Sequence, residues 1–340
     1  MAVLLASALF TADPSAHVFD NRIFVYPSHD RKTNITANDN GDQYDMADYH
    51  VFSNPSLNPY DPVIDHGVFL TVADVPWISR QLWAPDAAYN NEKYYLYFPA
   101  RNKEERFQIG VAVSDKPEGP FTPDSEPIAG SFSIDPASFV DIDGQGYIYF
   151  GGLWGGQLQC YQKDNTFDPA WLGSQEPNAT GIYALGPRVA KLSSDMHSFD
   201  GKVQEIQILD PETNKPLLAD DYDRRFFEAP WMHKKDDIYY FSYSTGDTHY
   251  LVYATSKTPL GPFTYAGRIL EPVLGWTTHH SILEYMEQWW LFSHDASLSN
   301  GTDYLRSVKF EPIFYDEDGK LTISKPAKKS HHVPPKIMLG

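Results

Sequence analysis

A single carboxylate stands among aromatic residues in the segment Phe226–Trp231, which reads FFEAPW. The acid is Glu228, and a strand-like aromatic run, 238–243, follows it closely. Ionising a carboxyl group in an apolar setting is unfavourable, so we expect a raised pKa for Glu228. A carboxyl group that keeps its proton near neutral pH is suited to act as a proton donor.

Two aspartates occupy related turns elsewhere in the chain. Asp13 and Asp135 each stand directly before a proline, and their neighbours include the small polar residues Ser15 and Ser138. In such surroundings we expect both carboxylates to stay ionised. One protonated acid together with ionised carboxylates suits glycoside hydrolysis, where one group protonates the leaving oxygen and another activates water or attacks carbon. Residue types alone leave open which aspartate is the base and which one tunes the acid.

These turns belong to a unit that recurs five times. In each copy a short turn leads, across a hairpin signal, into a strand rich in aromatic residues. The turn and strand pairs are 12–16 with 23–28, 83–88 with 94–98, 134–138 with 147–151, 228–231 with 239–243, and 278–282 with 289–293. Two copies continue to a Gly-Pro-Phe turn, at 119–121 and 261–263. Repeated units of about four strands predict an all-β fold, a single-domain, five-bladed β-propeller.

One phase of this repeat is expected to form a ring near the propeller axis. Its members are Asp13, the pair Trp83–Ala84, Asp135, Glu228 and His279. Carboxylates gathered near an axis repel one another and lose hydration, so a functional site is a better explanation for them than turn formation alone.

Two long segments interrupt the repeat. Residues 31–80 and 153–225 lack its pattern, and we expect them to be functional loops that build the walls of the site. No domain boundary is visible. We therefore expect a catalytic propeller over residues 1–325 and a basic, proline-containing tail over residues 326–340.

Composition limits the possible partners and surroundings. The chain has 340 residues and a formal net charge of −18, which argues against nucleic acid or an anionic membrane as a partner. Its one cysteine, Cys160, excludes an internal disulfide. The apolar segment 3–10 lacks the basic residues of a signal peptide and is interpreted as a strand, which favours the cytoplasm slightly over secretion. Monomer and small homo-oligomer both remain open.

Aromatic residues make up 15% of the chain, and several tryptophans stand near the turns. Five of them could stack on sugar rings: Trp77, Trp83, Trp154, Trp231 and Trp276. Trp77, Trp83 and Trp154 are our candidates for binding substrate, while packing in the core is at least as good an interpretation for any one tryptophan.

Taken together, these motifs resemble glycoside hydrolase family 43, the five-bladed inverting propeller enzymes. The nearest branch holds β-xylosidases and bifunctional β-xylosidase/α-L-arabinofuranosidases. The resembling segments cover all five blades: 10–18, 26–30, 83–89, 130–137, 225–231 and 275–282. One difference is Ala229, where glycine is common in the family, and we expect no effect on the chemistry.

The resemblance implies a role for each candidate residue. It makes Asp13 the general base, Glu228 the general acid and Asp135 the residue that tunes and orients the acid. It also implies Ca²⁺, or water in its place, near a histidine that His279 matches, and an arginine reaching the sugar that Arg306 matches.

The implied activity is inverting exo-hydrolysis of xylo-oligosaccharides and arabinoxylan fragments, releasing xylose and also arabinofuranose. Two alternatives remain open: a retaining propeller hydrolase of the fructan- or sucrose-cleaving kind, and a non-catalytic sugar-binding propeller.

Overall fold

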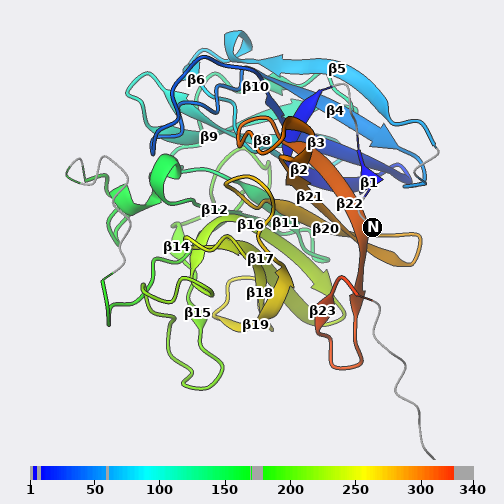
Figure 1. Cartoon of the computed structure of the whole chain (residues 1–340). Coiled ribbons are helices and arrows are strands. Elements are labelled where there is room, and N and C mark those ends of the chain that lie inside the picture. Colours follow the sequence, from blue (N-terminus) through cyan, green and yellow to red (C-terminus); the bar gives the residue numbers. More distant parts are fainter. Residues whose placement is uncertain (1–2, 6–8, 59–60, 169, 171–178, 325–340) are drawn as a thin grey trace, which may run out of the picture.

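The computed structural model describes residues 3–5, 9–58, 61–168, 170 and 179–324. Five mostly antiparallel sheets lie around a common centre, and within the described residues the only helices are short 3-10 turns (Figure 1). These turns are Val72–Asp74, Trp154–Gly156, Leu158–Cys160 and Ser297–Ser299. The predicted all-β, five-bladed propeller is confirmed.

The five blades follow the order of the chain. Blade I contains β2 (Phe10–Phe19), β3 (Arg22–Asp30), β4 (Asp48–Asn54) and β5 (Ile64–Thr71). Blade II contains β6 (Ile78–Arg80), β7 (Asp86–Asn90), β8 (Lys93–Asn102), β9 (Phe107–Ser114) and β10 (Thr122–Pro123). Blade III contains β11 (Ala137–Val140), β12 (Gly146–Phe150), β13 (Arg188–Lys191) and β14 (Gln204–Glu205). Blade IV contains β16 (Phe226–Lys235), β17 (Ile238–Thr245), β18 (Leu251–Ser256), β19 (Phe263–Leu270) and the edge strand β15 (Ile208–Leu209). Blade V contains β20 (His280–Tyr285), β21 (Gln288–Asp295) and β22 (Ser307–Tyr315), together with β1 (Val3–Leu4) and β23 (Leu321–Thr322).

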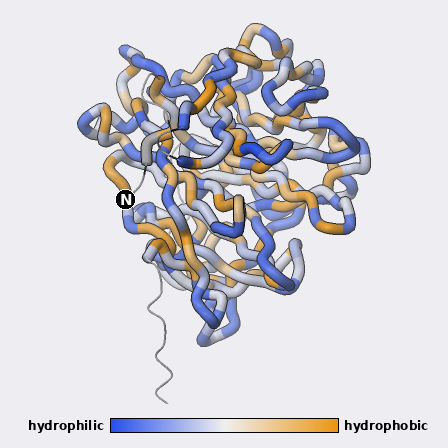
Figure 2. Tube along the Cα trace, turned by 90° about the vertical axis from the view of Figure 1, so that its right-hand side faces the viewer, coloured by the Kyte–Doolittle hydropathy of each residue, from blue (hydrophilic) through white to orange (hydrophobic). Residues whose placement is uncertain are grey.

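The innermost strands β2, β7, β11, β16 and β20 form the ring around the axis, and each packs against its two neighbours. The second strand of each blade is the aromatic run that the repeat predicts. In β8, for example, every residue after Lys93 is buried, because both faces of the blade pack against other blades. Many of the loops at the edge of the molecule are hydrophilic, and hydrophobic segments also run through its interior (Figure 2).

Tight turns join the first two strands of most blades. Asp20 and Asn21, which link β2 to β3, have φ of 48° and 58°. Met286 and Glu287, which link β20 to β21, have φ of 51° and 61°. Asp and Asn tolerate this left-handed conformation better than Met and Glu, and this explains why the hairpin signal is weakest in blade V.

The ring is closed by the two ends of the chain. β1 pairs with β22, so an N-terminal strand completes the sheet made by the last strands. Thr11 of blade I also donates its backbone N–H to the carbonyl of Arg306, at 2.9 Å. The described part of the chain contains no helix with the length and apolar character needed to cross a membrane.

The prediction that 31–80 and 153–225 are irregular loops was right in part: most of their described residues are irregular, and 37–46 and 153–156 contribute to the pocket walls, but both segments also contain strands. The first segment holds β4, β5 and β6, and the second holds β13, β14 and β15. These outer strands are short or polar and show little alternation, which hid them in the sequence. The predicted C-terminal tail, 326–340, lies outside the described residues.

Candidate active site

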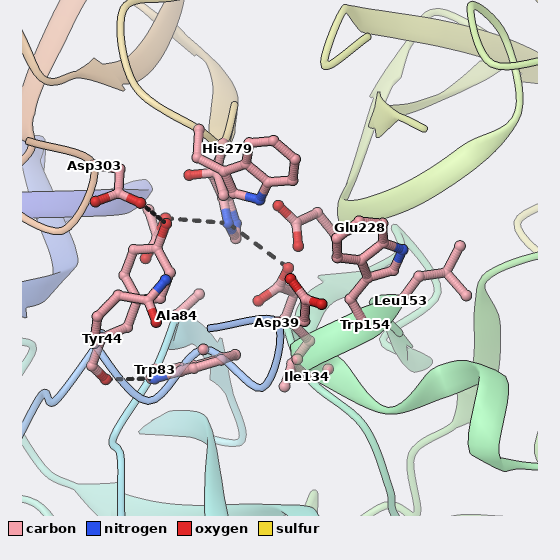
Figure 3. A pocket seen from close by; sticks show the side chains of 18 of the residues that line it. Asp39, Tyr44, Trp83, Ala84, Ile134, Leu153, Trp154, Glu228, His279 and Asp303 are labelled. Carbon is pink, nitrogen blue, oxygen red and sulfur yellow. Dashed lines mark hydrogen bonds and ion pairs between the residues drawn. The ribbon is translucent and has the colours of Figure 1, made fainter. Parts of the chain in front are cut away.

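A pocket of about 270 Å³ opens where the innermost strands begin, and residues from all five blades line it (Figure 3). Asp13, Ala84, Asp135, Glu228 and His279 form its floor and sides, one from each blade. Its walls come from the loops between strands: Ala37, Asn38, Asp39, Gly41, Gln43, Tyr44, Met46, Leu153, Trp154, Gly155, Gly156, Trp276, Thr277 and Asp303.

β-Bulges aim the carboxylates into this pocket. In β2, Ala12 pairs with Ser28 and Ser15 with Tyr26, so Asp13 and its proline together stand opposite Pro27 alone, and the strand has one extra residue. Asp13 has φ 48°, and Asp135 has φ 56° at the same point of blade III. A bulge bends the strand and redirects a side chain, and it is tolerated here because the surrounding sheet fixes it.

Glu228 does not occupy the same point of its bulge. Glu228 pairs with Ser244 and Trp231 with Ser242, so the bulge in β16 consists of Ala229 and Pro230. Ala229, with φ 57°, is therefore the counterpart of Asp13, and Glu228 stands one residue earlier. This corrects the predicted ring phase. The left-handed φ also explains a preference for glycine at 229, since alanine there costs roughly 1–2 kcal/mol.

Asp13 is held as a carboxylate by a cation. Its Oδ1 lies 2.9 Å from Arg306 Nη1, its Oδ2 lies 3.2 Å from Arg306 Nη2, and Ser28 Oγ donates to Oδ2 at 2.7 Å. Burial raises the pKa of Asp13, but the Arg306 guanidinium and the Ser28 hydroxyl outweigh burial and lower that pKa to about 2. Asp13 is thus ionised across the physiological pH range.

Arg306 has no donor left over for a sugar in this structure. Its five N–H groups go to Asp30 (from Nε and Nη2, both 2.9 Å), to Asp13 (from Nη1 and Nη2) and to Thr277 Oγ1 (from Nη1, 3.0 Å). Its side chain lines the pocket, yet only 3% of the residue is exposed. In this arrangement every N–H group of the guanidinium is used within the protein, and two of them hold Asp13. A contact between Arg306 and the sugar stays a prediction.

Asp30 is the second carboxylate on this arginine, and sequence reasoning missed it. Its carboxylate makes a bidentate contact, in which Oδ2 accepts from Arg306 Nε and Oδ1 from Arg306 Nη2. Asp30 also accepts the Arg306 backbone N–H at 2.8 Å. Burial raises the pKa of Asp30 in spite of Arg306. The only hint in the sequence was the acid at the end of a strand in the 26–30 motif.

Glu228 and Asp135 face the same pocket, and none of the described residues gives either of them a cation as close as Arg306 is to Asp13. Burial, and then the negative charge of Asp13, raise the pKa of Glu228 to about 8. Burial, and then the charges of Glu228 and Asp13, raise the pKa of Asp135 well above its usual range. Because these two carboxyl groups repel each other when both are ionised, the pair retains a proton near neutral pH.

The geometry favours Glu228 as the holder of that proton. Asp135 Oδ2 accepts the backbone N–H of Ala229 at 3.0 Å, and a hydrogen bond from a donor stabilises the ionised form of a carboxyl group. Glu228 projects into the open part of the pocket (Figure 3). Asp135 is thus placed to hold a negative charge beneath the segment that carries Glu228.

His279 lies between the carboxylates as a neutral base. Its Nδ1 is 3.6 Å from Asp13 Oδ1 and 3.9 Å from Asp135 Oδ2. Burial lowers the pKa of His279 to about 4. Its neighbour His294 accepts the Asp13 backbone N–H on Nδ1, at 2.9 Å, and burial lowers its pKa to about 3.

The potential ligand atoms around His279 meet the coordination requirements of Ca²⁺ only in part. Calcium prefers six to eight oxygen ligands. His279 offers one imidazole, while Asp13 is bound to Arg306 and Asp135 to the Ala229 N–H. A calcium ion here would need water for most of its ligands.

The predicted tryptophans separate into two groups. Trp83 and Trp154 line the pocket, on opposite sides (Figure 3). The Trp83 indole donates to the Tyr44 carbonyl at 2.9 Å, and a Cβ atom at Gly41 would lie 2.6 Å from its ring. The loop therefore needs a glycine where it crosses this indole.

Trp77 is not a pocket residue, so this prediction was wrong. It stacks on Phe98 in the core of blades I and II, with ring centroids 6.2 Å apart. Trp276, in contrast, lines the pocket with 42% of its surface exposed and lies 5.9 Å from Trp154. Nothing in the local sequence separates a core tryptophan from a pocket tryptophan, because both stand near turns.

Comparison with known proteins gives consistent results. The sequence matches the profile of the family described as Glycosyl hydrolases family 43 over residues 8–321. It is 68% identical over 323 residues to a xylosidase/arabinosidase of Humicola insolens, covering 95% of this chain and 99% of that one. It is 52% identical over 312 residues to a xylosidase/arabinosidase of Bacteroides ovatus, covering 92% of this chain and 94% of that one.

Solved structures agree. One is a β-xylosidase/α-arabinofuranosidase from a compost microbial metagenome, in complex with xylotriose and in a calcium-free form. It is similar with a TM-score of 0.91 and 53% identity, covering 96% of this chain and 98% of that one. A family 43 enzyme from Xanthomonas citri complexed with xylotriose is similar with a TM-score of 0.88 and 52% identity, covering 95% of this chain and 93% of that one.

Proposed function

Since this chain belongs to glycosyl hydrolases family 43, we propose that it is an inverting exo-glycosidase that releases xylose and arabinofuranose from xylo-oligosaccharides and arabinoxylan fragments. One observation carries the proposal. A single pocket holds an ionised Asp13, with a pKa of about 2, and a protonated Glu228, with a pKa of about 8. Inverting hydrolysis needs this pair of protonation states at the same pH.

In the proposed mechanism Glu228 protonates the glycosidic oxygen as the bond to the anomeric carbon breaks. A water on the opposite face of the sugar attacks that carbon, and Asp13 takes its proton. The attacking water becomes strongly acidic as it bonds to the oxocarbenium-like carbon, so a carboxylate of low pKa is a sufficient base. The products are two sugars with the anomer inverted. Exchange of one proton with solvent returns Asp13 and Glu228 to their starting states.

The neighbouring residues hold these two states apart. Arg306 keeps Asp13 ionised and fixes both of its oxygens. Asp135 adds negative charge near Glu228 and binds the backbone N–H next to it. The donor therefore keeps its proton until the leaving oxygen develops charge.

The substrate class is supported by the pocket and by the relatives. Trp83, Trp154 and Trp276 offer flat aromatic surfaces of the kind that stack on sugar rings. The relatives carry xylosidase and arabinosidase activities in their names, and two of the similar structures hold xylotriose. A small pocket enclosed by all five blades suits the end of a chain better than its middle.

We also propose that any calcium ion in the pocket binds beside His279, largely through water. It would add positive charge near Asp13 and Asp135, and none of the steps above requires it. A similar solved structure in calcium-free form supports the view that the ion is separable from the fold.

The test is a kinetic comparison of aryl β-xyloside, aryl α-arabinofuranoside and xylobiose, with and without a chelator, combined with NMR of the first anomer formed. We expect turnover of all three substrates and inversion of configuration. Retention would replace this proposal with the fructan- or sucrose-type mechanism. No turnover at all would favour a sugar-binding module.

A further inference from the structure

A second cluster of metal-ligating side chains lies in blade I, away from the pocket. His29 on β3 and Asp48 and His50 on β4 place one potential ligand atom each within 4.8 Å of the others. None of the three lines the active-site pocket. We propose that this cluster binds a divalent transition-metal ion of the zinc class.

The ligand atoms already face one another. His29 Nδ1 lies 2.6 Å from Asp48 Oδ1, and His50 Nε2 lies 3.8 Å from the same oxygen. The two imidazole rings are 4.9 Å apart and nearly perpendicular. Their side chains are 19% and 13% exposed and that of Asp48 is 25% exposed, so an ion can enter from solvent and still be partly enclosed. A small outward movement of Asp48 from His29 opens the space for the ion.

An outer carboxylate orients one of the ligands. His50 Nδ1 lies 3.0 and 3.2 Å from the two oxygens of Asp65 on β5. Since Nδ1 faces Asp65, the other ring nitrogen, Nε2, is the one that faces Asp48. Asp65 is itself fixed by the Gly67 backbone N–H at 2.8 Å. A carboxylate behind a histidine in this way fixes its tautomer and strengthens it as a metal ligand.

The types of ligand atom in the cluster indicate which metal ion it would bind. Two imidazoles and one carboxylate suit Zn²⁺, Co²⁺ or Ni²⁺, whereas Ca²⁺ and Mg²⁺ prefer oxygen ligands. Three protein ligands leave a fourth position for water. The cluster is therefore different in chemistry from the calcium expected beside His279.

The cluster would join the two ends of a pocket loop. β3 and β4 pair at Ile23–Asn54, Phe24–Ser53 and Val25–Phe52, and the same register sets His29 opposite Asp48, where backbone pairing has ended. The loop 31–47 leaves and re-enters the blade at this point and supplies the wall from Ala37 to Met46. His29 also directly precedes Asp30, the residue that holds Arg306. A bound ion would thus fix the base of the substrate wall and the support of the catalytic base.

The test is calorimetric titration of the chelator-treated full chain with ZnCl₂, comparing wild type, His50→Gln and His66→Gln. His66 is a matched control, because it lies on neighbouring β5 and bonds Ser53 instead of the cluster. We expect one Zn²⁺ site that His66→Gln keeps and His50→Gln weakens by at least about 10-fold. Zn²⁺ should also raise the melting temperature of wild type and His66→Gln, but not of His50→Gln.

Equal Zn²⁺ affinity and stoichiometry in wild type and His50→Gln would overturn the proposal, whatever other sites bind the metal. If His50→Gln does not fold, Asp65→Asn replaces it, with an expected loss of roughly 10-fold in affinity. Unchanged binding in Asp65→Asn would equally overturn it. Displacement of Zn²⁺ from this site by equimolar Ca²⁺ would contradict the assigned metal class.

Discussion

The two sides of the pocket give the same kind of side chain opposite properties. On the side of blades I and V, Asp13 meets a guanidinium, two histidines and a hydroxyl, and its pKa falls to about 2. On the side of blades III and IV, the part of the chain that the structure describes brings no cation equally close to Glu228 or Asp135, and the pKa of Glu228 rises to about 8. Burial raises the pKa on both sides, so burial does not distinguish them. The position of one arginine does.

The partners of Arg306 also limit its effect on the charge state of Glu228. Asp30 and Asp13 together take four of the five guanidinium N–H groups, and Thr277 takes the fifth. Two carboxylates on one arginine leave little net positive charge to act across the pocket. The base is stabilised locally, while the donor still experiences the negative charge of Asp13.

The largest effect should follow removal of the base. We expect Asp13→Asn to lower kcat by about 10⁴-fold on xylobiose and on aryl xyloside alike, because water must be activated whatever the leaving group. Steady-state kinetics on both substrates measures this, with circular dichroism to check the fold. A loss confined to xylobiose would assign the acid role to Asp13 instead.

Removal of the donor should depend on the leaving group. We expect Glu228→Ala to lose about 10³-fold in kcat on xylobiose and much less on an aryl xyloside whose phenolate leaves without help. The ratio of the two losses is the measurement. Equal losses would contradict the role of Glu228 as the acid.

Replacing Arg306 should raise the pKa of Asp13 and so make it more similar to Glu228. Arg306→Lys keeps a charge but loses the forked contact, so the pKa of Asp13 should rise and the acid limb of kcat/KM should shift upward. We expect kcat/KM at pH 4, relative to pH 6, to fall several-fold below the wild-type ratio. An unchanged profile would show that Arg306 has only a structural role.

The raised pKa of Glu228 should also lower the free energy of unfolding as the pH rises toward 8. Glu228 ionises near 4.5 in the unfolded chain and near 8 in the folded protein, so between these values the folded state binds more protons and stability falls as pH rises. Glu228→Gln removes this penalty. We expect its melting temperature to exceed that of wild type by roughly 2–4 °C or more at pH 8, with a smaller gain at pH 5. The same gain at both pH values would argue against a raised pKa.

The smallest effects should separate the pocket tryptophan from the core tryptophan. Trp83→Phe is expected to raise KM for xylobiose several-fold, because it removes part of the pocket wall. Trp77→Phe should leave kcat and KM unchanged and lower the free energy of unfolding by roughly 1–3 kcal/mol, since it leaves a gap beside Phe98. Loss of activity in Trp77→Phe without loss of stability would reverse the two assignments.

Much of this arrangement was predictable from sequence. The five turn-and-strand units gave the propeller, and the motifs gave family 43 and the three acidic residues of the pocket. The environment of Glu228 gave the direction of its pKa, because its aromatic neighbours are adjacent in the chain. The short outer strands of blades I and III escaped prediction because they lack strong periodicity.

Long-range contacts set the limit of that prediction. The ion pair between Asp13 and Arg306 joins blade I to blade V. No local sequence pattern reveals which N–H groups of an arginine are already hydrogen-bonded within the protein. Glu228 differs from the predicted ring phase by one residue because the bulge in β16 begins at Ala229, after the acid, whereas the bulge in β2 begins at Asp13 itself; only the pairing register shows this.

Closure of the ring by the two ends of the chain has a consequence for synthesis on the ribosome. Asp13 and Arg306 are separated by 293 positions, so most of the propeller is synthesised after the first partner and before the second. A nascent chain that ends before Arg306 already contains the proton donor, but its base has neither a guanidinium nor a closed ring around it. Contacts of such long range form late and slowly. We therefore expect a chain that ends before Arg306 to be inactive, because the carboxylate of Asp13 then lacks its guanidinium partner.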